Sequence, residues 1–208
     1  MVKHPPPDDP RQAWLLVTVS TAGASSTLRV HAWRKLRSLG AVYIHKSVAV
    51  LPRRPQTSRA VNRLVDRVRH EGGQATVWSI ELADAAQEAE LVAAFQAERS
   101  DEYNEVCSRT PAFLAEIAQE RARGRTTYAE VEESEADLDR LRTWLGRVQA
   151  RDYFDAPGAA EAAAAVESCV DALAAFEADA LRAEAPDLDV DQPPAVRRLR
   201  ALPRGSER

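Results

Sequence analysis

The sequence predicts an α+β protein in which a ferredoxin-like βαββαβ module with an antiparallel sheet is followed by an all-helical module. Two observations predict this class. Over residues 13–83, short apolar runs typical of strands alternate with segments whose apolar residues recur at helical spacing. Over residues 84–184, only the helical spacing is found. Two right-handed crossovers in the first module would place both of its helices on one face of a four-stranded sheet.

The first strand and helix have clear boundary signals. Residues 13–19 form an apolar run that is short enough for a buried strand. Small turn-forming residues follow, and Ser25 or Ser26 is a natural N-cap. Over residues 27–39 the apolar side chains recur three and four positions apart, and Gly40 fits the C-terminal cap. We therefore expect a strand, a tight turn and an amphipathic helix.

A hairpin, a second helix and a fourth strand are predicted to complete this module. Residues 41–44 and 48–51 are β-rich runs separated by three polar residues, which is typical of a hairpin. The next helix is closed by two glycines, Gly72 and Gly73. Its apolar positions are Val61, Leu64, Val65 and Val68. Residues 76–82 then alternate between apolar and polar side chains, as a half-buried strand does.

The helical module is predicted to begin with several separate helices. The first of them covers residues 84–98, and Ser100 caps a further short segment. Thr110 and Pro111 combine an N-cap with a proline at the first helical position. We therefore expect a new helix to start there and to stop near Gly124.

The last two helices are predicted to pair as an antiparallel hairpin. Thr127 and Glu130 fit a capping box at the start of the first of them. Apolar side chains then recur in alternating three- and four-residue steps in both segments. The two stripes are Val131, Ser134, Leu138, Leu141, Leu145 and Val148, and Val166, Cys169, Leu173, Phe176 and Ala180. A short connection at residues 151–155 would turn the chain back on itself.

Composition limits the class of function. No run approaches the roughly 20 apolar residues that a membrane span requires, and the N-terminus lacks the apolar core of a signal peptide. We expect a cytoplasmic protein without membrane contact, with a flexible tail at 1–12 and a disordered tail at 185–208, where no periodicity is present. The two cysteines and four histidines show no metal-ligand spacing, and no glycine-rich phosphate loop or nucleophile elbow is present. The sequence thus predicts no enzyme, no metal and no cofactor.

Charge divides the chain into two unlike halves. Residues 1–82 hold 13 Lys and Arg against 5 Asp and Glu, a net charge of +8. The remaining residues hold 15 against 27, a net charge of −12. Such a split indicates two modules with different surfaces, of which the basic one would face an anion.

A row of arginines is the strongest candidate for a binding surface. Arg59, Arg63 and Arg67 recur every four residues and share one face of the second predicted helix. Arg53 and Arg54 lie just before that helix. Guanidinium groups bind phosphates as planar, bidentate donors, so these five residues would contact the DNA backbone. An ordinary solvated helix face is the alternative interpretation.

Two weaker candidates concern anions and redox chemistry. Ser25, Ser26, Arg29 and Arg34 surround the start of the first predicted helix, where free amide groups and hydroxyls suit a tetrahedral oxyanion such as chromate or sulfate. Ordinary capping beside a surface arginine is the alternative interpretation. Cys107 lies in a polar stretch near an arginine, which would allow a redox-sensing thiol.

Several segments together resemble a known family. They are Trp14–Val17, Ser26–Val30, Trp33–Leu36, Leu39–Ala41 and Val48–Pro52, followed by Gly72, Gly73, Phe95, Tyr103 and Arg151–Phe154. Over residues 13–184 this pattern resembles the N-terminal domain of ChrB-type chromate-resistance proteins. The ferredoxin-like part is also similar to PaaX-type repressors.

The resemblance implies a chromate-responsive regulator of transcription. The leading expectation is a homodimer that binds DNA through the five arginines. An oxyanion sensor for chromate or sulfate and a protein-interaction scaffold, both without DNA binding, are the alternatives. ChrB proteins commonly carry a further C-terminal domain, so a separate protein of that type is an expected partner.

Overall fold

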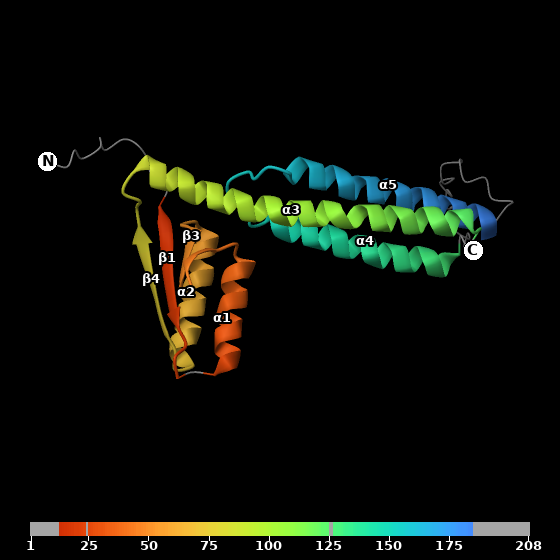
Figure 1. Cartoon of the computed structure of the whole chain (residues 1–208). Coiled ribbons are helices and arrows are strands. Elements are labelled where there is room, and N and C mark those ends of the chain that lie inside the picture. The colour runs from red at the N-terminus through yellow and green to blue at the C-terminus, as the bar shows by residue number, and fades with distance from the viewer. Residues whose placement is uncertain (1–12, 24, 125–126, 185–208) are drawn as a thin grey trace, which may run out of the picture.

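The computed structural model describes residues 13–23, 25–124 and 127–184, so the tails expected at 1–12 and 185–208 lie outside the described residues. It confirms the α+β class: a four-stranded antiparallel sheet with two helices is followed by a helical part (Figure 1).

Four strands form the sheet in the order β2-β3-β1-β4, and all neighbours are antiparallel. The strands are β1 (Trp14–Ser20), β2 (Val42–His45), β3 (Val48–Pro52) and β4 (Gln74–Ile80). This order results from two crossovers and one hairpin, as expected for a ferredoxin-like module. The last strand begins and ends two residues earlier than predicted.

Helices α1 (Ser26–Ser38) and α2 (Pro55–His70) cover one face of this sheet. Ser25 is the N-cap of α1, since its hydroxyl accepts a hydrogen bond from the Leu28 amide at 3.2 Å. The predicted apolar face of α2 is buried against the sheet. Local capping and periodicity therefore determine both helices as the sequence predicts.

Helix α3 (Ala85–Ala122) runs without a break, so the predicted helix starts at Ser100 and at Thr110-Pro111 are wrong. Pro111 has no amide hydrogen for the carbonyl group of Cys107, which an interior proline normally leaves without its helical partner. The Thr110 hydroxyl donates to that carbonyl at 3.0 Å instead. Buried side chains also recur in three- and four-residue steps on both sides of the proline, and their packing holds the helix together. They are Phe95, Arg99, Tyr103, Val106, Thr110, Phe113 and Ile117.

Helices α4 (Tyr128–Gln149) and α5 (Ala159–Glu184) form the predicted antiparallel hairpin, and α3 packs along both of them. The result is a three-helix bundle that extends away from the sheet (Figure 1). The apolar residues of both predicted stripes are buried, and only Ser134 is half-buried. Thr127 is the N-cap of α4 and accepts a hydrogen bond from the Glu130 amide at 3.4 Å.

An aromatic cluster joins the two parts of the molecule. The first turns of α3 and the connection between α4 and α5 pack on the sheet face that α1 and α2 leave open. Trp14 of β1 lies 5.6 Å from Phe95 of α3 and 5.5 Å from Phe154 of the connection, measured between ring centroids. The Tyr153 hydroxyl donates to the carbonyl oxygen of Leu39 at 2.7 Å. The connection thus ties the sheet, α1 and α3 together.

Candidate functional site

The exposed face of α2 carries the predicted arginine row. The opposite face of α2 packs on the sheet through Val61, Leu64 and other apolar side chains. Because an α-helix rises 1.5 Å per residue, side chains four positions apart follow one another at intervals of about 6 Å. Arg59, Arg63 and Arg67 therefore form an exposed line of guanidinium groups along one helix.

The five predicted arginines differ in what their side chains contact. Within the described residues, no hydrogen bond or ion pair involves the side chain of Arg53, Arg59 or Arg63, and all three are exposed. Arg67 forms an ion pair with Glu71 at 2.7 Å, and both side chains of this pair remain in contact with solvent. Such surface pairs contribute about 0.5 kcal/mol and exchange readily for other partners.

Arg54 is exposed, but its side chain contacts another part of the protein. Its Nη2 donates to the carbonyl oxygen of Tyr153 at 2.6 Å, and its guanidinium carbon lies 5.0 Å from the centre of the Tyr153 ring. Its backbone amide donates to the Thr57 hydroxyl at 3.0 Å at the start of α2. Arg54 therefore links α2 to the α4–α5 connection, which sequence spacing could not indicate.

The structure does not bring the predicted oxyanion ligands into one site. The Ser25 hydroxyl is occupied by the cap of α1. Arg29 and Arg34 lie on different sides of α1 and line different cavities. Arg34 lines a cavity of about 380 Å³ together with Ser26, Thr27, Val30 and His31.

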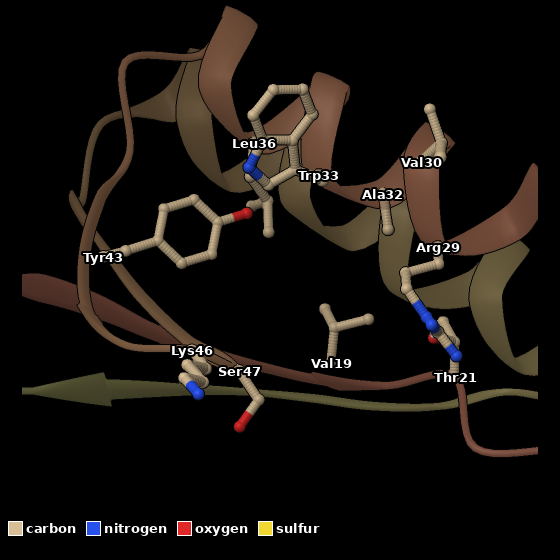
Figure 2. A pocket seen from close by; sticks show the side chains of 10 residues that line it. All are labelled: Val19, Thr21, Arg29, Val30, Ala32, Trp33, Leu36, Tyr43, Lys46 and Ser47. Carbon is tan, nitrogen blue, oxygen red and sulfur yellow. Dashed lines mark hydrogen bonds between the residues drawn. The ribbon is translucent and has the colours of Figure 1, made fainter. Parts of the chain in front are cut away.

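Arg29 lines a second cavity, of about 330 Å³, between α1, the end of β1 and the β2–β3 hairpin (Figure 2). Its Nε donates to the Thr21 hydroxyl at 3.1 Å. Lys46 and Ser47 of the hairpin turn and Tyr43 of β2 also line this cavity. Sequence spacing does not bring these residues together, and the only signal for their proximity is the predicted crossover, which returns β2 to the side of α1.

Cys107 is half-buried on α3. Burial raises the pKa of its thiol, and the nearby Glu161 carboxylate raises this pKa further. Both effects lower the fraction of reactive thiolate at neutral pH.

A buried ion network lies at the junction of the two parts. The Arg99 side chain on α3 is only 5% exposed, and its Nε lies 2.8 Å from a carboxylate oxygen of Glu102. Arg151 contacts the other oxygen of Glu102 at 2.8 Å. The Nη1 of Arg99 has no hydrogen-bond partner among the described residues. This network positions α3 against the α4–α5 connection.

The described residues contain neither a metal-binding cluster nor a membrane-spanning helix. No three His, Cys, Asp or Glu side chains gather there in a way that could hold a metal ion. None of the described helices has a stretch both long and apolar enough to cross a membrane.

Comparisons with known proteins place the chain in a family. The family model described as "Protein ChrB, N-terminal" matches residues 29–186. Protein ChrB of Cupriavidus metallidurans is 32% identical over 160 residues, which cover 75% of this chain and 45% of that protein. The chain thus spans less than half the length of this relative. No solved structure matches it. The family match covers most of both the ferredoxin-like part and the helical bundle, and on this evidence the chain belongs to the ChrB family through its N-terminal domain.

Proposed function

We propose that this chain is a chromate-responsive regulator that contacts the DNA backbone through the exposed face of α2. Membership of the ChrB family supports a role in chromate resistance. The observation that carries the DNA contact is the set of exposed arginines whose side chains have no partner among the described residues, Arg53, Arg59 and Arg63. Arg67 joins them when DNA phosphate replaces Glu71 as its partner.

The physical argument rests on charge and exposure. A guanidinium keeps its charge at all physiological pH values and offers paired donors to phosphate oxygens. Each phosphate that is neutralised releases condensed counterions, so binding weakens as salt rises. Regular spacing of charge along α2 suits the phosphate backbone and defines no pattern of base contacts, so we assign this face to backbone contacts.

The experiment is a fluorescence-anisotropy titration of the whole chain with its own upstream DNA, at salt concentrations between about 50 and 200 mM. The test variant is Arg59→Gln/Arg63→Gln. The matched control is Arg142→Gln/Arg147→Gln, which removes the same charge from exposed positions of α4.

The slope of log affinity against log salt is negative, and the loss of two phosphate contacts should make it shallower by about 1.8. We expect this change in the test variant and none in the control. We also expect chromate to release the unaltered protein from DNA. Absence of binding at the lowest salt, or an equal effect of both variants, would refute the role of α2.

An oxyanion sensor without DNA binding is the second candidate function. The cavity that contains Arg34, His31 and the hydroxyls of Ser26 and Thr27 favours it. In that case chromate or sulfate should raise the melting temperature, and Arg34→Ala should remove the effect. A melting temperature that neither anion changes would exclude this candidate.

A further inference from the structure

The cavity beside Arg29 combines apolar walls with positive charge. Six of its ten lining residues are apolar or aromatic: Val19, Val30, Ala32, Trp33, Leu36 and Tyr43. The other four are Thr21, Arg29, Lys46 and Ser47, and no acidic residue is among them. Its volume, about 330 Å³, lies at the lower end of the range in which small-molecule sites are found.

The two aromatic rings and Arg29 lie at different ends of the cavity. Figure 2 shows Trp33 and Tyr43 together at one end, and Arg29 beside Thr21 at the other. Ala32, Leu36 and Val19 lie between these ends. A ligand that fills the cavity would therefore meet aromatic rings with one part and a guanidinium with the other.

Arg29 is prepared to bind a carboxylate. Its Nε is held by the Thr21 hydroxyl at 3.1 Å, which orients the guanidinium and leaves both Nη groups for a ligand. Neither Arg29 nor Lys46 forms an ion pair within the described residues. The two cations thus leave this cavity with a positive charge that the surrounding side chains do not neutralise.

The aromatic end is also ordered. The guanidinium carbon of Arg37 lies 5.2 Å from the centre of the Trp33 ring, a cation–π contact that restrains the indole. Trp33 nevertheless remains 47% exposed, which is unusual for such a large apolar side chain. A flat ring placed against Trp33 and Tyr43 would remove this surface from water.

We propose that this cavity binds a small aromatic carboxylate, with the ring against Trp33 and Tyr43 and the carboxylate on Arg29. A bare inorganic oxyanion would satisfy the cations and leave the apolar walls exposed to water. A neutral aromatic compound would fill the walls and leave the cations unpaired. The site lies on the α1 and hairpin side of the module and does not depend on DNA binding by α2.

The test is isothermal titration calorimetry of the whole chain, without DNA, with three matched probes. These are 1-naphthoate, the neutral 1-naphthamide, and sulfate. We expect saturable binding of 1-naphthoate, at least about tenfold weaker binding of the amide, and no saturable binding of sulfate. Equal affinity for the acid and the amide would overturn the proposal, as would preference for sulfate or no saturable binding of 1-naphthoate.

Variants locate the site. Arg29→Gln should weaken 1-naphthoate binding by about tenfold. Arg34→Gln is the matched control, since it removes the same charge from α1 outside this cavity. An Arg34→Gln effect as large as that of Arg29→Gln would refute the location. Because the assay contains no DNA, failure here is distinguishable from failure of the proposed regulator function.

Discussion

Glu102→Ala should destabilise the protein strongly, because Glu102 is the main partner of a buried cation. The Arg99 side chain is 5% exposed and contacts Glu102 at 2.8 Å. The carboxylate of Glu98 lies 3.3 Å from Arg99 but is 48% exposed, so water screens this contact. Loss of Glu102 would leave Arg99 buried with only this weaker partner.

The magnitude follows from the cost of an unpaired buried charge. Removal of one partner from a buried ion pair costs roughly 3–5 kcal/mol. Since Arg99 keeps Glu98, we expect a value near the lower limit, about 3 kcal/mol. For a chain of this size, that corresponds to a fall of about 6–12 °C in melting temperature.

Urea denaturation followed by circular dichroism measures the effect as a change in the free energy of unfolding. Glu105→Ala is the control, because Glu105 is exposed on the same helix and its removal should change stability by less than about 0.5 kcal/mol. Arg99→Met/Glu102→Leu should recover most of the loss, since apolar side chains remove the uncompensated charge. A cost below about 1 kcal/mol for Glu102→Ala, or a double variant no more stable than the single one, would refute the reasoning.

Three further predictions concern α3 and the close approach at Gly40. Thr110→Val should cost about 1–2 kcal/mol in unfolding free energy, because it leaves the Cys107 carbonyl before the proline without a donor; a Thr110→Ser variant that is equally unstable would contradict this explanation. Glu161→Gln should speed alkylation of Cys107 by iodoacetamide at neutral pH, because the Glu161 charge raises the thiol pKa; an unchanged rate would leave burial as the sole cause. Gly40→Ala should destabilise the protein by more than about 1 kcal/mol, measured by urea denaturation. Gly40 has φ +72°, and an added Cβ would lie 2.8 Å from Nη1 of Arg99. Unaltered stability would show that Arg99 can move away.

Stability should not depend on Cys107 ionisation at neutral pH. Burial raises the thiol pKa in the folded protein above its unfolded value of about 8.5. Below that value the thiol is neutral in both the folded and the unfolded protein. The contribution of this group is then lost only as pH rises through the folded pKa. Cys107→Ser should reduce the loss of stability seen between neutral and alkaline pH.

Local signals predict the ferredoxin-like part well. Each strand and helix there has its own periodicity and boundary residues, and the strand order follows from the handedness of the crossovers. In α3 local signals predict false helix boundaries, because the buried stripe includes two polar side chains, Arg99 and Thr110. Their polar groups are paired with Glu102 and with the Cys107 carbonyl, and apolar spacing alone therefore does not reveal the continuous helix.

In the candidate sites, too, some features follow from sequence spacing and others do not. The line of Arg59, Arg63 and Arg67 follows from four-residue spacing on one helix and is found exposed as the spacing indicates. The engagement of Arg54 with Tyr153 joins residues 99 positions apart. No spacing rule could have shown that Arg54 has a partner within the protein.

By itself, the sequence determined the α+β class, the capped and amphipathic helices, the helical hairpin and the family resemblance, because these depend on neighbours a few residues apart. Only the tertiary structure decided that α3 continues through Pro111, since buried packing on both sides of the proline outweighs its local cost. Only the tertiary structure separated Arg29 from Arg34 and placed Arg29 with Lys46, because the β1-α1-β2 crossover brings the hairpin turn to the side of α1. Local chemistry specifies the helices and strands, whereas burial and the crossovers between them specify which side chains meet.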